Sequence, residues 1–264
     1  MDTYGLLGYP LGHSFSRRFF TEKFHNEGID AEYLNFEIPD ASLLRDIVSS
    51  HPRLRGLNVT IPHKQAVIPQ LDAISTQARE IGAVNVIKID RNTDGSSRLT
   101  GHNADVIGFS KSIAPLLKPY HHKALVLGTG GASKAVYYGL KKLNIEPVCV
   151  SRHAPHLTYQ EITPELIQEY TVIVNCTPVG MFPHTAECPP LPYESLTPQH
   201  LLYDLIYNPE ETMFMKCGQK AGAVTKNGLE MLHLQALASW DIWQSNQTKQ
   251  YSESVNMTKS IPNV

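Results

Sequence analysis

The sequence has few cysteines, little net charge and no long apolar run, and each shortage excludes a class of protein. Its 264 residues contain four cysteines, at positions 149, 176, 188 and 217, with no CxxC pair, which argues against a zinc ribbon or a disulfide scaffold. The twelve histidines are scattered without an HExxH motif, so no metal site is expected. We therefore expect a protein with reduced thiols and no bound metal.

Charge and hydropathy also restrict the partners and the location of the protein. The formal net charge is −2 and there is no run of lysine or arginine, which argues against nucleic acid as a partner. No apolar run has the length of a membrane-spanning helix, and the first residues lack the pattern of a signal peptide. We expect a cytoplasmic protein that binds no membrane.

The N-terminal third alternates strand and helix patterns. Apolar or alternating runs predict strands at residues 4–9, 33–38, 54–59 and 83–89, with helical patterns between them. The turn Asn92-Thr93-Asp94-Gly95 then predicts a hairpin. Together these elements indicate a mixed sheet covered by helices.

A second unit follows the hairpin. Short apolar runs at residues 124–127, 147–150, 171–174 and 201–206 are typical of parallel strands that are buried on both faces. We predict an α/β fold of two lobes: a mixed α/β substrate-binding catalytic domain at residues 1–103, and a Rossmann-like dinucleotide-binding domain at 104–229. A C-terminal helix at about 230–248 should pack back on the first lobe. The polar, aperiodic pattern of residues 249–264 predicts a loose tail.

A glycine-rich turn joins the strand at 124–127 to the following helix. Its residues are Gly128-Thr129-Gly130-Gly131-Ala132. Glycines permit a tight turn and close approach of the backbone to a pyrophosphate, and the helix N-terminus attracts the anion. A GxG pair can also merely turn the chain, but the strand–turn–helix context favours dinucleotide binding.

The end of the next strand distinguishes the two common dinucleotides. An NAD site usually places an acidic residue there, whereas this chain has Ser151, Arg152 and His153. A guanidinium suits the 2′-phosphate, which favours NADP. The alternative is that Arg152 is a solvated surface charge.

Polar residues cluster at three further junctions between predicted elements. Ser14 and Ser16 begin the first helix, where they cap it or hold a carboxylate. Lys64 lies on the opening turn of a helix, where an acidic residue would suit the helix dipole better, and this misfit points to function. Asn85 is a polar residue in an apolar run and must find a partner, while Asp105 either caps its helix or acts in the site.

The order of these motifs resembles the shikimate dehydrogenases, including their quinate/shikimate relatives, from Tyr4 to about Trp243. The motifs that carry the resemblance are Ser14-x-Ser16, Asn58-Val59-Thr60-Ile61-Pro62-x-Lys64, Gly82-Ala83-Val84-Asn85, Asn103-x-Asp105 with Gly108, Gly128-x-Gly130-Gly131-Ala132, Asn175-x-Thr177-Pro178-x-Gly180-Met181, Asp204-x-x-Tyr207-x-Pro209, and Gly228-Leu229 with Gln235. The sequence departs from the usual pattern at Arg17, Val86, Ala104, Ser151 and His153, and these departures leave Lys64 and Asp105 in place.

The resemblance implies reversible, NADPH-dependent reduction of 3-dehydroshikimate to shikimate in the chorismate route, with Lys64 and Asp105 as the catalytic pair. The substrate-binding residues that it implies are Ser14, Ser16, Asn58, Thr60, Asn85, Tyr207 and Gln235. The NADP-binding residues that it implies are Gly128, Thr129, Gly130, Gly131, Ala132, Ser151, Arg152, His153, Leu205 and Gly228.

Two other functions remain open at this stage. A quinate/shikimate dehydrogenase of broader specificity would need the same residue types. A non-catalytic dinucleotide sensor could share the fold, because a fold alone does not determine function. We expect a monomer or a homodimer whose two lobes close on binding.

Overall fold

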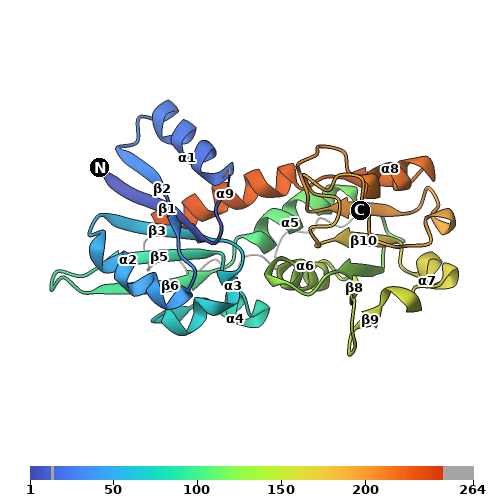
Figure 1. The fold of residues 1–264 in the computed structure, drawn as a ribbon, viewed down its shortest axis with the longest axis horizontal. Coiled ribbons are helices and arrows are strands. Elements are labelled where there is room, and N and C mark those ends of the chain that lie inside the picture. The colour runs from blue at the N-terminus through green and yellow to red at the C-terminus, as the bar shows by residue number, and fades with distance from the viewer. Residues whose placement is uncertain (13–14, 246–264) are drawn as a thin grey trace, which may run out of the picture.

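The structure is a computed structural model that describes residues 1–12 and 15–245, and these form two sheets flanked by helices (Figure 1). The first sheet has the strand order β2-β1-β3-β5-β6-β4. Its strands are β1 (Asp2–Gly8), β2 (Ala31–Glu37), β3 (Leu54–Val59), β4 (Ala73–Ile74), β5 (Val86–Arg91) and β6 (Ser97–His102). The helices of this half are α1 (Phe15–Asn26), α2 (Leu44–Ser50), α3 (His63–Ala66) and α4 (Thr76–Ile81).

The second sheet is parallel throughout and has the order β12-β11-β10-β7-β8-β9. Its strands are β7 (Lys123–Leu127), β8 (Glu146–Ser151), β9 (Leu157–Thr158), β10 (Val172–Asn175), β11 (Leu201–Asp204) and β12 (Val224–Lys226). The helices of this half are α5 (Asp105–Ile113), α6 (Gly131–Lys142), α7 (Pro164–Glu169), α8 (Met213–Lys220) and α9 (Leu229–Gln244). This architecture confirms the predicted α/β class, with a mixed first sheet and a parallel second one.

The first sheet is mixed because β5 runs antiparallel to both β3 and β6, while β1 is parallel to β2 and β3. The hairpin between β5 and β6 has the predicted turn, in which Gly95 has a φ of +84°. Strand β5 begins at Val86 rather than at residue 83, because the backbone before it turns to contact a neighbouring helix. There the Val84 amide donates to the carbonyl oxygen of Lys64 at 2.7 Å.

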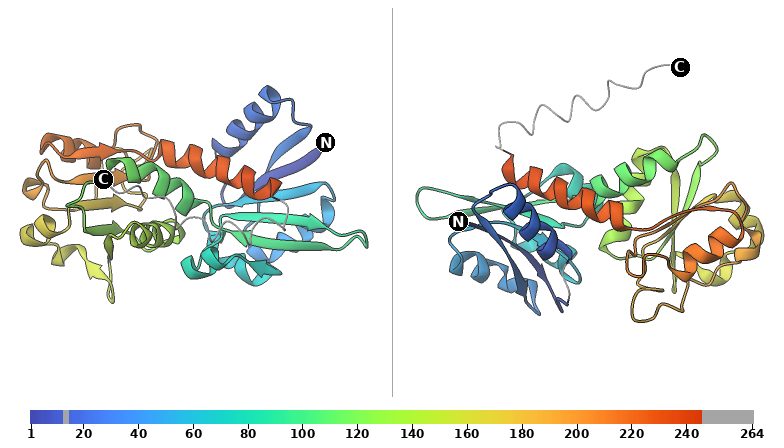
Figure 2. Two further views of the ribbon diagram at one scale, coloured as in Figure 1. Left: turned by 180° about the vertical axis from the view of Figure 1, so that it is seen from behind. Right: turned by 90° about the horizontal axis from the view of Figure 1, so that it is seen from above.

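Helix α9 runs alongside α5 and spans both halves of the molecule (Figures 1 and 2). Near its start Met231 packs in the core of the second sheet, and near its end Trp243 packs in the core of the first. Trp243 Nε1 also donates to the Ile87 carbonyl at 3.1 Å. Helix α9 thus contacts the cores of both sheets, and it ends at Gln244, whereas the sequence pattern predicts an end at about 248. The predicted tail lies outside the described residues.

Close approach of α5 to α9 depends on Gly108, since a Cβ there would lie 2.5 Å from the Met231 carbonyl oxygen. Because α5 directly follows β6, this packing fixes the start of α5 against α9. Within the described residues, no helix is both long and apolar enough to span a bilayer.

Candidate active site

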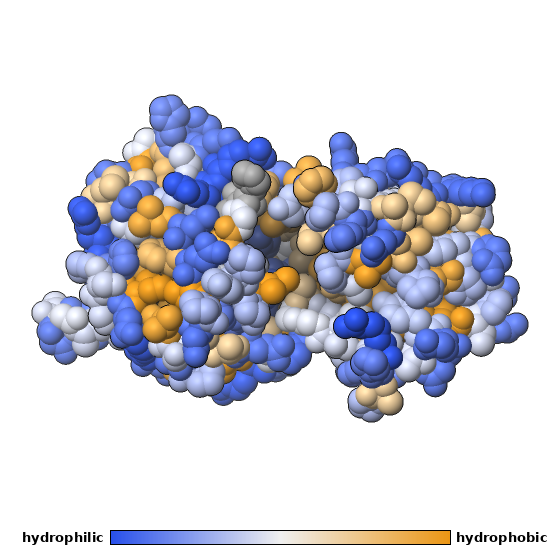
Figure 3. Space-filling view, in the orientation of Figure 1, coloured by the Kyte–Doolittle hydropathy of each residue, from blue (hydrophilic) through white to orange (hydrophobic). Residues whose placement is uncertain are grey.

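A cleft of about 560 Å³ opens between the two sheets, within the size range of small-molecule sites (Figure 3). Polar and charged side chains line it from segments near strand ends in both halves and from α9. The predicted residues that line it are Ser16, Asn58, Thr60, Lys64, Asn85, Asp105, Ala132, Leu205, Tyr207, Gly228 and Gln235. Side chains from positions as far apart as Ser16 and Gln235 thus line one concave surface.

Lys64 and Asp105 form an ion pair in this cleft. Lys64 Nζ lies 2.6 Å from Asp105 Oδ2, and the two side chains are 17% and 6% exposed. Lys64 belongs to α3, a single turn that begins directly after Pro62, as the sequence predicts. Low exposure strengthens the electrostatic interaction because little water screens it.

Asp105 does not cap its own helix. The side chain of Asn103 caps this helix instead, since its Oδ1 accepts a hydrogen bond from the Val106 amide at 3.2 Å. Asn103 is itself held by a bond from its Nδ2 to the Ala83 carbonyl at 2.9 Å. The Asp105 carboxylate is therefore available to the cleft, and of the two alternatives left open by the sequence the geometry favours a role in the site.

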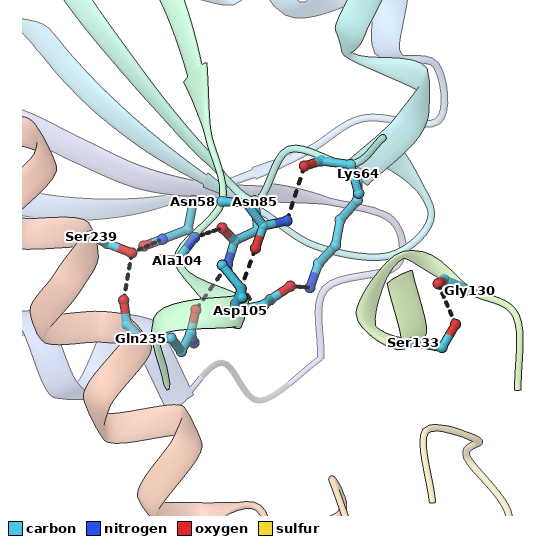
Figure 4. Close-up of polar contacts among 12 residues, drawn as sticks. Asn58, Lys64, Asn85, Ala104, Asp105, Gly130, Ser133, Gln235 and Ser239 are labelled. Atoms are coloured by element: carbon cyan, nitrogen blue, oxygen red, sulfur yellow. Dashed lines mark hydrogen bonds and ion pairs between the residues drawn. The ribbon is translucent and has the colours of Figure 1, made fainter. Parts of the chain in front are cut away.

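Asn85 connects the ion pair to the helices behind it (Figure 4). Its Nδ2 donates to Asp105 Oδ1 at 2.8 Å and to Gln235 Oε1 at 3.1 Å. Its Oδ1 accepts from the Ala104 amide at 2.6 Å. The buried amide thus finds the partners that its burial requires, and it fixes the orientation of the carboxylate.

Asn58 lines the cleft near the end of β3, and the residues that hold it are not evident from the sequence. Its Oδ1 accepts from the Tyr33 hydroxyl at 2.8 Å, and its Nδ2 donates to Ser239 Oγ at 2.8 Å. Burial raises the pKa of Tyr33 well above its usual value, while a hydrogen bond with Ser16 lowers it, so Tyr33 stays a neutral donor. Tyr33 and Ser239 therefore support the site from β2 and α9.

Three further predicted substrate residues also line the cleft. Ser16 and Thr60 line it from the first half, and Tyr207 lines it from the loop after β11. The Tyr207 ring lies 6.2 Å from that of Phe15, an edge contact across the two halves. Ser14 lies outside the described residues.

The predicted glycine turn, residues 128–132, connects β7 to α6. Gly128 has a φ of +106°, a backbone conformation that favours glycine, and a Cβ there would lie 3.2 Å from Thr177 Cγ2. A Cβ on Gly130 would have no heavy atom within 4 Å, so this position faces open space at the N-terminus of a 12-residue helix. Free amides beside open space suit a pyrophosphate group, so the residues present fit a dinucleotide.

Ser151, Arg152 and His153 do not line the cleft. Ser151 ends β8, and its Oγ accepts from the His153 amide at 3.0 Å, which closes a tight turn. The Arg152 and His153 side chains that follow are exposed. An exposed guanidinium at the end of β8, beside the glycine turn, is suitably placed for an adenosine phosphate.

Leu205 and Gly228 meet where the second half borders the cleft. A Cβ on Gly228 would lie 2.1 Å from the Leu205 carbonyl oxygen, and the Gly228 amide donates to Ile206 at 3.0 Å. This close backbone approach allows α9 to begin beside β11.

Asp204 is a buried carboxylate that the sequence marks only as part of a motif. It accepts hydrogen bonds from Thr212 Oγ1 at 2.7 Å, the Ile206 amide at 3.0 Å and Asn175 Nδ2 at 3.1 Å. Burial raises its pKa to about 6, against the opposing effect of these bonds. The network joins the ends of β10 and β11 beneath the cleft.

Replacement of Asp204 should change how stability depends on pH. Because its pKa is raised in the folded state, Asp204 binds its proton more tightly there than in the unfolded chain. Its contribution to the free energy of unfolding is therefore greatest below pH 4 and is lost as the pH rises through about 6. The fall that this one group causes is at most about 3 kcal/mol. Asp204→Asn should remove it, as measured by denaturant unfolding at pH 5 and pH 8.

The control is Asp94→Asn. Asp94 is fully exposed, and hydrogen bonds from Ser96 hold its pKa below the usual value, so it is ionised at both pH 5 and pH 8. Its replacement should therefore leave the difference in unfolding free energy between the two pH values as in the wild type. An Asp204→Asn protein whose unfolding free energy changes between the two pH values as much as that of the wild type would contradict the assignment.

Among residues 1–12 and 15–245, no group of three or more histidine, cysteine or acidic side chains is placed to hold a metal ion.

Comparison with known proteins shows the family of the chain. Residues 6–87 match the family described as the shikimate dehydrogenase substrate binding domain. The shikimate dehydrogenase (NADP(+)) of Carboxydothermus hydrogenoformans is 36% identical over 257 residues, which cover 90% of each chain. The chain belongs to the shikimate dehydrogenase family.

Solved structures extend the family likeness to the whole fold. A chorismate mutase/shikimate 5-dehydrogenase fusion protein from Clostridium acetobutylicum superposes with a TM-score of 0.80 at 36% identity, covering 95% of this chain and 93% of that one. A quinate dehydrogenase from Corynebacterium glutamicum in complex with NAD reaches the same TM-score of 0.80 at 27% identity, covering 92% and 93%. Proteins with this fold thus differ in substrate and dinucleotide. The fold therefore does not determine the specificity, which depends on the side chains of the site.

Proposed function

We propose that the protein is an NADP-dependent shikimate dehydrogenase, which reversibly reduces 3-dehydroshikimate to shikimate in aromatic amino acid biosynthesis. The observation that carries this proposal is the Lys64–Asp105 ion pair, 2.6 Å long, in a cleft that the glycine-turn helix also borders. A dinucleotide sensor would need the glycine turn but no such pair facing the cleft.

Lys64 is the acid of the reduction. When bound, NADPH supplies a hydride to the substrate carbonyl carbon. The carbonyl oxygen then gains negative charge. The Lys64 ammonium stabilises this charge and donates a proton to the oxygen. In the reverse direction the neutral amine accepts the proton from the substrate hydroxyl.

Asp105 keeps Lys64 oriented and accepts a hydrogen bond from a substrate hydroxyl. Its other oxygen is occupied by Asn85, so the carboxylate cannot rotate away from the lysine. This arrangement holds the ammonium in place before the substrate arrives, which lowers the cost of orienting it during the reaction.

The other predicted polar residues of the site hold a small hydroxylated ring acid. Ser14 and Ser16 bind its carboxylate, and the residues that bind its hydroxyls are Asn58, Thr60, Asn85, Tyr207 and Gln235. Hydroxyl and amide groups of this kind discriminate strongly between substrates with and without the matching hydroxyl, because a substrate that lacks it leaves these groups without a hydrogen-bond partner.

The cofactor is NADP rather than NAD. Gly128, Thr129, Gly130, Gly131 and Ala132 hold the pyrophosphate, and Leu205 and Gly228 lie near the nicotinamide. At the adenosine end Ser151, Arg152 and His153 hold the 2′-phosphate, with no acidic residue at this strand end to receive a free 2′-hydroxyl.

Arg152→Ala should therefore weaken the use of NADP selectively. A charge-assisted hydrogen bond contributes about 1.5–3 kcal/mol, so kcat/KM for NADP should fall about tenfold to hundredfold. The same constant for NAD, measured on the same preparation, is the internal control and should change little. An equal fall for both dinucleotides would contradict the role of Arg152.

A quinate/shikimate dehydrogenase of broader specificity is the second candidate, and the likeness to the quinate dehydrogenase structure favours including it. The deciding experiment measures oxidation of shikimate and of quinate, each with NADP and with NAD. We expect shikimate with NADP to give the highest kcat/KM. Faster turnover of quinate would replace the first proposal by the second.

The finer organisation follows from this function. We propose residues 1–103 as the substrate-binding domain and 104–229 as the NADP-binding domain, with the last helix returning to the first. The protein acts in the cytoplasm on small molecules, without nucleic acid, as a monomer or a homodimer.

A further inference from the structure

The start of helix α6 touches the side chain of Lys64. A Cβ on Gly131 would lie 3.1 Å from Lys64 Cβ and 3.2 Å from Lys64 Cδ, both closer than ordinary van der Waals contact. A methyl group at Gly131 would thus press the aliphatic stem of the lysine away by a few tenths of an ångström. Figure 4 shows this stem running between α3 and the turn that contains Gly130, toward Asp105.

Gly130, the preceding residue, differs in this respect. A Cβ added there would meet no heavy atom within 4 Å. Gly130 therefore faces the open space in which a dinucleotide phosphate would lie, whereas the missing side chain of Gly131 faces the lysine. Two adjacent glycines of one motif have different physical reasons to be glycine.

A second contact joins the same two helices. Lys134 Nζ, on α6, donates to Oε1 of Gln65, the residue after Lys64, at 2.7 Å. At the opposite side of α3 the carbonyl oxygen of Lys64 accepts from the Val84 amide at 2.7 Å. The short helix α3 is thus held between the segment before β5 and the first turn of α6.

We propose that Gly131 is a positioning residue for Lys64, in addition to any contact it makes with the cofactor. The inference deepens the proposed function and rests on it for the meaning of Lys64. A lysine side chain has many rotamers, and ordering it costs conformational entropy. The backbone surface at Gly131 restricts the stem, so the ammonium stays beside Asp105 within the cleft.

The test compares Gly131→Ala with Gly130→Ala as the matched control. Gly131 has a negative φ at the first turn of α6, where alanine is favoured over glycine, so the variant should fold and its thermal stability should be retained. The first readout uses the cofactor-free protein. It is the rate at which acetic anhydride acylates Lys64, measured by peptide mass spectrometry against Lys123 as internal reference.

We expect Gly131→Ala to increase acylation of Lys64 about fivefold, because the displaced stem weakens the ion pair and exposes the amine. Gly130→Ala should leave it unchanged. In steady-state assays Gly131→Ala should lower kcat about tenfold with little change in the KM for NADPH, and Gly130→Ala should mainly raise that KM.

Wild-type acylation of Lys64 in Gly131→Ala would overturn the proposal, as would a Gly131→Ala protein that only raises the KM for NADPH. If Gly131→Ala does not fold, Lys134→Met removes the neighbouring link to α3 and should increase acylation in the same direction, and an unchanged rate there overturns the proposal. The acylation measurement requires no turnover. It therefore separates failure of this inference from failure of the proposed enzyme activity.

Discussion

Lys64→Met is expected to lower kcat for 3-dehydroshikimate reduction by about 10³-fold, with a much smaller change in the KM for NADPH. Methionine keeps the approximate length of the side chain but removes both the charge and the proton. Because the ammonium acts on charge that develops during the reaction, its loss should appear in kcat rather than in cofactor binding. Steady-state oxidation of NADPH, followed by absorbance, measures both constants.

Lys123→Met is the matched control. Lys123 also forms an ion pair, with Glu169, but at the surface of the second half and away from the cleft. Its replacement should leave kcat within about twofold of the wild type, since exposed ion pairs contribute little. Equal activity in Lys64→Met and Lys123→Met would refute the catalytic role of Lys64.

Asp105→Asn is expected to lower kcat/KM by about 10²-fold to 10³-fold. The amide has nearly the same shape as the carboxylate, so the fold should be kept, but the charge that holds Lys64 is lost. The amide group would also face two donors, Lys64 Nζ and Asn85 Nδ2, with only one acceptor oxygen. One of the two contacts must therefore break.

The comparison for this variant is Asp90→Asn, which changes an ion-pair partner of Lys88 at 3.7 Å on the hairpin of the first sheet. Asp90 lies outside the cleft, so activity should be nearly that of the wild type. If Asp90→Asn lost as much activity as Asp105→Asn, the loss in Asp105→Asn would reflect a general effect on folding. A similar loss of thermal stability in both variants would indicate the same.

The sequence is sufficient to predict the features that depend on local pattern. The buried strand at 124–127, the glycine turn and the helix after it follow one another in the structure as the residues predict. Strand β3 has the bounds that its apolar run indicates, and Lys64 lies on the short helix after Pro62. Local hydrophobic periodicity and glycine conformation are enough for such elements.

Features that depend on contacts between distant segments were not predictable in this way. Ser239 bonds to Asn58 across 181 positions of the chain, and nothing near either residue indicates the other. Whether Asp105 caps its own helix depends on Asn103, which reaches back to Ala83 and so fixes its own orientation. The short edge strands β4, β9 and β12 likewise lack a pattern of their own, since pairing with a neighbour stabilises them.

Gly131 illustrates the same limit inside a recognisable motif. The turn predicts a phosphate site, but the contact with the Lys64 stem exists only because α3 of the first half packs against α6 of the second. Packing between two lobes is set by the whole fold, so a motif read in isolation gives only part of the role of each residue.

The central claim is that this cleft reduces a ring ketone with a hydride from NADPH and a proton from Lys64. Its most direct test is to add 3-dehydroshikimate to the wild-type protein with NADPH, and to measure NADPH consumption together with the product. We expect shikimate to form in an amount equal to the NADPH oxidised. Binding of NADPH with no consumption that depends on 3-dehydroshikimate would contradict it.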